Sequence, residues 1–398
     1  MKYDPATRLQ ETMHLDPHNG VNQAITDSAT FAFDTGEDMT ACFHGEKEAF
    51  LYSRHWNPTG FELSKALAAM EGTEAAWITG SGMGAITASL LQLCVAGDHI
   101  ISSVTTYGGT YAFLKNWMPK YNIEVTFVDI TDIDAIKSAI RPNTKVIYTE
   151  TLTNPMLQVS DVPKLSEISK ANNITLVVDN TFTPMIFSPI ALGADIVVYS
   201  MTKFVNGKND TTAGAICASL DFINSLIDLN DGTAMLLGPV LDPMRASSIH
   251  KNLFTLHIRM KQHSKNAAFL AEKFVEVGLK ANYPGLETHK QHSLFKRDYN
   301  EEFGFGGMIS IDLETAENAS KFMALMQKRG VGYLAVSLGY FKTLFSNSGK
   351  STSSEVPEKT QKEMGMSEGL VRYSVGLDND MENTWQIIHS CLTDLKML

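Results

Sequence analysis

The chain has 398 residues, of which 44% are hydrophobic and 19% are charged, and its formal net charge at pH 7 is −11. This length exceeds what one compact core usually holds, so we expect more than one domain. The acidic balance, with no block dense in Lys and Arg, argues against a nucleic-acid partner.

The cysteines lead us to expect a cytoplasmic location. The four cysteines are far apart and form no C-x-x-C pair, which favours reduced thiols over a disulfide framework. The first residues contain no apolar signal segment, and no apolar run approaches the length of a bilayer span, so we expect no membrane partner. We expect no metal site, because there is no H-E-x-x-H motif and His289 and His292 lie in a loop-like segment.

Residues 1–57 are polar and irregular, so we expect an arm that is either mobile or fixed to another surface. The arm contains Tyr52 and Arg54, just before Asn57-Pro58-Thr59. Arg suits phosphate because its planar guanidinium donates two hydrogen bonds at fixed geometry. Taken alone, however, these two residues fit an ordinary polar surface better.

Residues 58–245 alternate short apolar runs with amphipathic helical stretches. This pattern predicts a doubly wound, mostly parallel α/β domain with ligands at the carboxyl ends of its strands. The expected strands are residues 75–79, 99–103, 123–128, 145–148, 174–178 and 195–199.

A glycine-rich turn at 79–85 follows the first of these strands and opens a helix. Its glycines let the backbone approach a phosphate, and the helix N-terminus offers unpaired N–H donors. Gly80, Gly82 and Ala85 also satisfy a relaxed dinucleotide fingerprint, but residues 102–105 supply no acidic partner for a ribose. A plain turn that packs the helix on the strand stays an alternative.

Tyr107 opens a second turn, Tyr107-Gly108-Gly109-Thr110, after the next strand. A tyrosine there can stack on a flat cofactor ring or carry a proton. An aromatic residue that only anchors the turn explains the pattern equally well.

Asp179 and Lys203 each follow a strand, and Lys203 is preceded by Ser200 and Thr202. Their separation leaves room for one short crossover and the next strand, which places the carboxylate and the amine at the same sheet edge. Pyridoxal phosphate (PLP) chemistry requires a lysine that binds the cofactor and an aspartate beside its pyridinium nitrogen. Either residue alone fits a helix cap or a solvated lysine better, but the combination favours a PLP site.

From residue 246 onward the pattern changes. A helix is expected from Ser247 towards Val277, followed by a smaller α+β region with a strand at 308–313. Arg372 lies in an apolar, strand-like run, where either a substrate carboxylate or a structural salt bridge would be its partner. The Ser/Thr-rich stretch 346–354 fits an exposed loop better than a mobile flap. We therefore divide the chain into an arm (1–57), a large α/β domain (58–245) and a C-terminal α+β domain (246–398).

Together these segments resemble the Cys/Met-metabolism PLP enzymes, a branch of the fold-type I superfamily. The resemblance covers nearly the whole chain, and its motifs occur in family order. Within the family, Ala335-Val336-Ser337-Leu338-Gly339 and the segment that follows it are most similar to plant-type methionine gamma-lyases. The motifs are Tyr52-Ser53-Arg54, Asn57-Pro58-Thr59, Ser81-Gly82-Met83-Gly84-Ala85, Tyr107-Gly108-Gly109-Thr110, Asn154-Pro155, Val178-Asp179-Asn180-Thr181, Ser200-Met201-Thr202-Lys203, Ala335-Val336-Ser337-Leu338-Gly339 and Gly369-Leu370-Val371-Arg372.

The resemblance implies a role for each site residue. Lys203 would bind the cofactor and shuttle protons, Asp179 would keep the ring nitrogen protonated, and Tyr107 would stack on the ring and protonate the leaving thiolate. The remaining residues would hold two negatively charged groups. The phosphate would be held by Gly82, Met83, Ser200 and Thr202. Tyr52 and Arg54 would reach the same phosphate from a neighbouring subunit, in a homotetramer built from dimers. The substrate α-carboxylate would be held by Asn154, Ser337 and Arg372.

The activity implied is γ-elimination of L-methionine, a small sulfur amino acid, to methanethiol, 2-oxobutanoate and ammonia. A cystathionine gamma-lyase or synthase, or an O-acetylhomoserine sulfhydrylase, stays an alternative, because the family shares its machinery. An NAD(P)-dependent oxidoreductase and a non-catalytic binding protein are less favoured. Two departures affect the choice: Gly109 stands where bacterial and protozoan methionine gamma-lyases have Cys, and Lys208-Asn209-Asp210 replaces a Gly-His-Ser-Asp-like ending.

Overall fold

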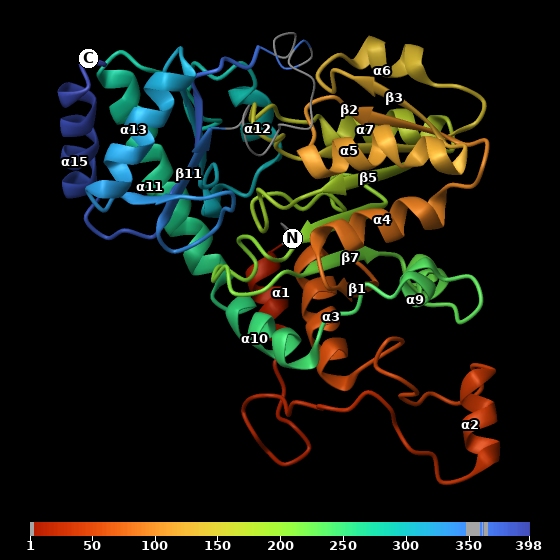
Figure 1. Cartoon of the computed structure of the whole chain (residues 1–398). Coiled ribbons are helices and arrows are strands. Elements are labelled where there is room, and N and C mark those ends of the chain that lie inside the picture. Colours follow the sequence, from red (N-terminus) through yellow and green to blue (C-terminus); the bar gives the residue numbers. More distant parts are fainter. Residues whose placement is uncertain (1–3, 348–358, 360, 362–364) are drawn as a thin grey trace.

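Two β-sheets organise the chain (Figure 1). The computed structural model describes residues 4–347, 359, 361 and 365–398, so most of the Ser/Thr-rich stretch lies outside the described residues. The larger sheet has seven strands in the order β1-β7-β6-β5-β4-β2-β3, and only β7 is antiparallel to its neighbours. Its strands are β1 (Ala75–Thr79), β2 (His99–Ser103), β3 (Glu124–Val128), β4 (Thr144–Glu150), β5 (Thr175–Asp179), β6 (Ile196–Ser200) and β7 (Gly214–Ala218).

The predicted mostly parallel α/β fold is confirmed. All six strands expected in residues 58–245 are present, with ends that differ by no more than two residues. The antiparallel strand β7 was not predicted. Its sequence, Gly-Ala-Ile-Cys-Ala, is short and rich in small residues, which gives it little strand character.

Helices cover both faces of the larger sheet, and the strand sequences explain why. Alternate residues of a strand point to opposite faces: Leu176 and Val178 enter one buried cluster, whereas Val177 enters the other. The first cluster is covered by α1 (Pro5–Glu11), α3 (Pro58–Glu71), α6 (Ile133–Ala139), α7 (Val162–Ala171) and α10 (Pro243–Leu253). The second is covered by α4 (Gly82–Leu93), α5 (Gly108–Asn116), η1 (Met118–Tyr121), α8 (Leu220–Leu226) and α9 (Thr233–Leu237).

The helix expected from Ser247 towards Val277 is instead two helices, α10 and α11 (Leu256–Glu276). At the break, the carbonyl of Asn252 accepts a hydrogen bond from the Arg259 guanidinium at 3.0 Å. The same guanidinium donates to the carbonyl of Val205 at 2.9 Å, two residues after Lys203. The break thus lets one arginine fasten the lysine-bearing turn, a contact that helical periodicity alone does not reveal.

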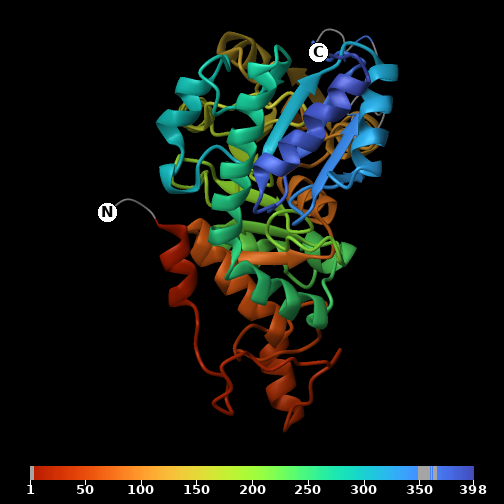
Figure 2. The same cartoon turned by 90° about the vertical axis from the view of Figure 1, so that its left-hand side faces the viewer.

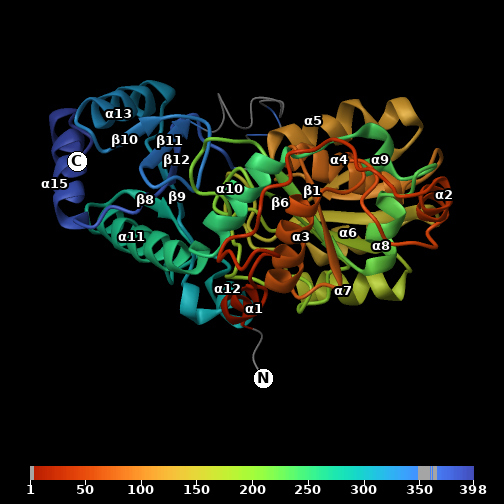
Figure 3. The same ribbon diagram turned by 90° about the horizontal axis from the view of Figure 1, so that it is seen from below.

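The smaller sheet has five strands in the order β10-β11-β12-β9-β8 and is flanked by α11, α13 and α15 (Figure 3). Residues 308–313, expected to form a strand, contain β9. Among the described residues, no helix combines the length and apolar character that a membrane span needs. The remaining elements are β8 (Lys280–Asn282), α12 (His292–Asp298), η2 (Glu301–Phe303), β9 (Met308–Asp312), α13 (Ala316–Lys328), β10 (Gly332–Leu334), β11 (Thr343–Asn347), β12 (Leu370–Ser374) and α15 (Met381–Asp394).

The N-terminal arm leaves the body of the chain after α1 and returns at α3. Figures 1 and 2 show it as an extended loop that carries α2 (Gly36–Phe43) well away from both sheets. It presents large apolar side chains to the exterior, among them Met39 and Phe43. The division of the chain at residues 57 and 245 stays a prediction.

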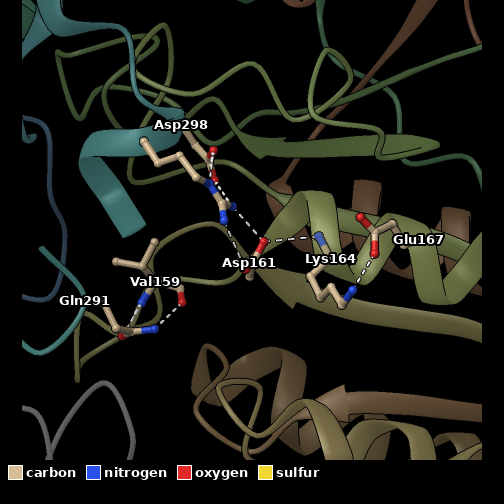
Figure 4. A network of polar contacts seen from close by, with 7 residues as sticks. Val159, Asp161, Lys164, Glu167, Gln291 and Asp298 are labelled. Atoms are coloured by element: carbon tan, nitrogen blue, oxygen red, sulfur yellow. Dashed lines mark hydrogen bonds and ion pairs between the residues drawn. The ribbon is translucent and has the colours of Figure 1, made fainter. Parts of the chain in front are cut away.

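Residues from the C-terminal part of the chain fasten the segment 156–161, which follows β4 of the larger sheet. The Gln291 side chain pairs with both backbone groups of Val159, with Oε1 accepting from the N–H at 2.9 Å and Nε2 donating to the carbonyl at 2.5 Å (Figure 4). Arg297 Nη2 lies 2.7 Å from Oδ1 of Asp161, which also caps α7. Two further side chains reach the same segment: Asn282 donates to the Met156 carbonyl at 2.6 Å, and the His289 ring is 3.0 Å from the Leu157 carbonyl.

These contacts predict unequal effects of two substitutions. Gln291→Ala should lower the free energy of unfolding by about 1–2 kcal/mol, because it leaves backbone groups of the buried Val159 without partners. Arg297→Ala should cost less, about 0.2–1 kcal/mol, because its ion pair is exposed. Urea denaturation followed by circular dichroism measures both. An equal or larger loss for Arg297→Ala would contradict this ranking.

Candidate active site

A cavity of about 400 Å³ opens at the carboxyl ends of β4, β5 and β6. This is the sheet edge at which the sequence predicts a site. Most of the expected site residues line it, namely Gly82, Met83, Tyr107, Asn154, Asp179, Ser200, Thr202, Lys203 and Arg372. Ser337 lies in an adjoining, more open cavity that shares Thr202, Thr212 and Val336 with the first.

Lys203 follows the end of β6 by three residues and points its amine into the cavity. Burial, with a smaller contribution from the positive charge of Arg372, lowers the pKa of the Lys203 amine to about 8. The amine donates a hydrogen bond to the Ser337 hydroxyl at 3.2 Å. A buried amine with a lowered pKa is partly neutral near physiological pH, which suits a nucleophile or a base.

Asp179 is the last residue of β5 and is only 8% exposed. Burial raises the pKa of this carboxyl, and hydrogen bonds from Thr181 oppose the shift; one of them comes from the Thr181 N–H at 2.9 Å. The Thr181 hydroxyl in turn accepts from the N–H of Ser200 at 2.8 Å. Thr181 thus fixes the ends of β5 and β6 relative to each other.

The N-terminus of α4 meets the end of β6 across a very narrow gap. Ser81 caps the helix by accepting from the Gly84 N–H at 3.0 Å. A Cβ atom at Gly82 would lie 2.6 Å from Cβ of Ser200, so only glycine fits there. The first N–H groups of α4 and the hydroxyls of Ser200 and Thr202 therefore border one small space, which is favourable for an anion.

Arg372 enters the site from the smaller sheet, in the middle of β12, and is 3% exposed. It donates to Asn154 Oδ1 at 3.0 Å and to the Ser337 carbonyl at 3.3 Å. Burial lowers its pKa to about 10, and no carboxylate pairs with it among the described residues. The three residues expected to bind a carboxylate are thus together, and Nε of Arg372 has no partner in the described part of the chain.

Glu150, the last residue of β4, is a component of the site that the sequence did not reveal. Its carboxylate accepts from the N–H of Tyr107 at 2.6 Å, from the N–H of Asn154 at 2.9 Å and from the Thr106 hydroxyl at 3.0 Å. Burial raises its pKa, and the charge of Asp179, its neighbour across β4 and β5, adds to the shift. Its position at a strand end, like that of Asp179, is the signal that could have identified it.

Tyr52 and Arg54 do not reach this cavity within one chain. Arg54 donates to the carbonyl of Met235 in α9, and its guanidinium lies 5.7 Å from the centre of the Tyr52 ring. Their expected contribution to a neighbouring subunit's site stays a prediction. His289, which the sequence did not favour as a metal ligand, contacts the backbone of Leu157, and the described residues contain no cluster of three potential metal ligands.

Comparisons with known proteins place the chain in a family. The family model described as "Cys/Met metabolism PLP-dependent enzyme" matches residues 7–389. A methionine gamma-lyase of Arabidopsis thaliana is 45% identical over 390 residues, which cover 96% of this chain and 88% of the relative.

Solved structures agree with this placement. An O-acetylhomoserine (thiol)-lyase structure from Campylobacter jejuni, with a pyridoxyl-lysine phosphate adduct, has a TM-score of 0.91 and 26% identity and covers 98% of this chain and 100% of that one. A cystathionine gamma-lyase structure from Lactobacillus plantarum with L-serine has a TM-score of 0.89 and 27% identity and covers 100% of both chains. With the resemblance of its motifs confirmed over nearly its whole length, the chain belongs to the Cys/Met metabolism PLP-dependent enzyme family.

Proposed function

We propose that this protein is a PLP-dependent carbon–sulfur lyase that converts L-methionine and water to methanethiol, 2-oxobutanoate and ammonia. The observation that carries the proposal is the buried Lys203 amine, which shares one cavity with the Asp179 carboxylate and the Arg372 guanidinium. The similarity to the plant methionine gamma-lyase supports the choice of methionine.

The residues of the cavity fit PLP. The narrow space at Gly82, with the N–H groups of α4 and the hydroxyls of Ser200 and Thr202, would hold the phosphate. Asp179 would face the pyridine nitrogen, and the Tyr107 ring would lie against the face of the cofactor. When bound, PLP stabilises the negative charge that develops on substrate carbons next to the amino nitrogen.

The chain's own groups would bind the substrate and move its protons. Arg372, Asn154 and Ser337 would hold the α-carboxylate, since the free Nε of Arg372 leaves a buried donor to be satisfied. The Lys203 amine would take a proton from Cα, release it to the cofactor, and as a free amine again take one from Cβ; a pKa of about 8 suits a base at neutral pH. The Tyr107 hydroxyl would give a proton to the sulfur that leaves Cγ.

The charge of the site supports methionine over cystathionine. Among the described residues that line the two adjoining cavities, Lys203 and Arg372 are the only cationic ones. Arg372 is assigned to the α-carboxylate. The more open cavity that contains Ser337, here called the outer cavity, contains Asp210 instead of a second cation. The distal carboxylate of cystathionine would therefore find no cation there, and only its distal ammonium could pair with Asp210, whereas the methyl thioether of methionine needs no charged partner.

We also propose that two copies of the chain share their active sites, within a homotetramer. Tyr52 and Arg54 lie outside the cavity of their own chain, on the arm that carries exposed apolar residues. They would supply phosphate contacts to the neighbouring copy. A cytoplasmic location, suggested by four cysteines that form no disulfide, is part of the same proposal.

A substrate panel tests the reaction. With L-methionine, the purified enzyme should release methanethiol and 2-oxobutanoate in equal amounts, with a kcat/KM above that for cystathionine and O-acetylhomoserine. Lys203→Ala should lose at least about 100-fold in kcat, because the proton-transfer group is gone. A higher kcat/KM for either of the other substrates would replace methionine as the assignment, and full turnover by Lys203→Ala would refute the mechanism.

Arg372→Lys should separate carboxylate binding from the other functions of the site. Lysine keeps the charge but cannot donate two fixed bonds, so kcat/KM for methionine should fall about 10- to 100-fold, mainly through a higher KM. Steady-state kinetics measures the split. An unchanged KM would mean that Arg372 binds another group.

Mixing two inactive variants tests the shared site. Arg54→Ala and Lys203→Ala homo-oligomers should both be poorly active, but hybrids formed after co-refolding contain one site with both native residues. Random pairing should restore about a quarter of the native activity. The control mixture of Lys203→Ala with the chain that carries both substitutions should stay inactive. If the first mixture behaves like this control, each site is built from one chain.

A further inference from the structure

The loop between β6 and β7 contains an asparagine in an unusual backbone conformation. Asn209 has φ = 51°, in the left-handed region that favours glycine and, among other residues, asparagine and aspartate. Glycine would adopt this conformation without placing a polar side chain here, whereas asparagine or aspartate at position 209 adds one. Its amide lines the outer cavity, next to Ser337.

The amide of Asn209 is the outer end of a short chain of hydrogen bonds that leads to the Lys203 amine. The Ser337 hydroxyl donates to Asn209 Oδ1 at 2.8 Å, and the Lys203 amine donates to the same hydroxyl oxygen at 3.2 Å. A hydroxyl has one proton and two lone pairs. Because its proton is directed at Asn209, the oxygen presents a lone pair to Lys203.

We propose that Asn209 is a positioning residue for Lys203, whose side-chain oxygen takes the Ser337 proton and so orients the hydroxyl to accept a hydrogen bond from the amine. The inference rests on the proposed function only in that Lys203 is the reactive amine. It also explains what the unusual sequence Lys208-Asn209-Asp210 contributes in place of a Gly-His-Ser-Asp-like ending. A glycine or a short side chain at position 209 would leave the Ser337 hydroxyl free to turn.

The orientation of the hydroxyl has a measurable consequence. A hydroxyl oxygen that accepts from Lys203 stabilises the protonated amine, whereas a hydroxyl that has turned round can donate to the neutral amine and stabilise that form instead. The charged and titratable groups that share the cavity with Lys203 are Tyr107 just before α5, Glu150 on β4, Asp179 on β5 and Arg372 on β12. None of them is altered by a substitution at Asn209.

Two substitutions separate this role from a purely structural one. Asn209→Gly keeps the backbone conformation and removes the acceptor, while Asn209→Asp keeps an acceptor that cannot donate and adds negative charge. Asn173→Gly is the matched control, because Asn173 also has a positive φ of 54° but lies exposed beyond α7, away from the cavity. The full-length chain is freed of PLP with hydroxylamine, and its fold is verified by rebinding of PLP.

The readout is the pH dependence with which an amine-reactive acylating reagent labels Lys203, measured by peptide mass spectrometry. For Asn209→Gly, the labelling midpoint should fall by about 0.5–1 pH unit relative to the parent. For Asn209→Asp it should rise, and for Asn173→Gly it should not change. In the PLP-loaded enzyme, Asn209→Gly should lower kcat severalfold, and its effect on KM for methionine should be smaller than that of Arg372→Lys, because Arg372 and Asn154 still hold the carboxylate.

An unchanged midpoint in Asn209→Gly, or shifts of the same sign in the glycine and aspartate variants, would overturn the proposal. Failure of the proposed function would look different. Borohydride reduction of the parent enzyme followed by peptide mapping would then locate PLP at a residue other than Lys203, whatever the midpoints of the Asn209 variants.

Discussion

The burial of opposite charges in one cavity is the constraint on which the rest of the site depends. An amine, a guanidinium and two carboxylates are removed from water within one cavity, and each would be costly there without partners. The fold satisfies them with fixed donors and acceptors instead of direct ion pairs: Thr181 serves Asp179, the N–H groups of two loops serve Glu150, and Asn154 serves Arg372. Charges held in this way remain available for a ligand.

The two sheets contribute different halves of this arrangement. The parallel strands of the larger sheet end in the carboxylates and lead to the lysine, so their positions follow from the sheet geometry. The smaller sheet contributes Arg372, which β12 holds between β9 and β11. The cavity is therefore complete only when the two sheets keep a fixed position relative to each other. The contacts that Gln291, Asn282 and His289 make with residues 156–161 help to fix that position.

Local pattern predicted the parts of the structure that depend on local sequence. Apolar runs located six strands of the larger sheet, and strand-end chemistry located Asp179 and Lys203, because the carboxyl ends of parallel strands share one edge. What it missed depends on tertiary contacts. β7 is short and rich in small residues, the break before α11 is stabilised by Arg259, and Glu150 acts by accepting hydrogen bonds from the backbone of two loops.

The fastening of residues 156–161 also restricts how the molecule can move. Asn154, which contacts Arg372, lies two residues before this segment. The side chains that hydrogen-bond to the segment come from the same part of the chain as the smaller sheet. If the smaller sheet closed over the cavity by a hinge motion, the loop that contains Asn154 would therefore move with it. The residues that we propose to bind the α-carboxylate would then move together as one unit, and their distance to the Lys203 amine would change.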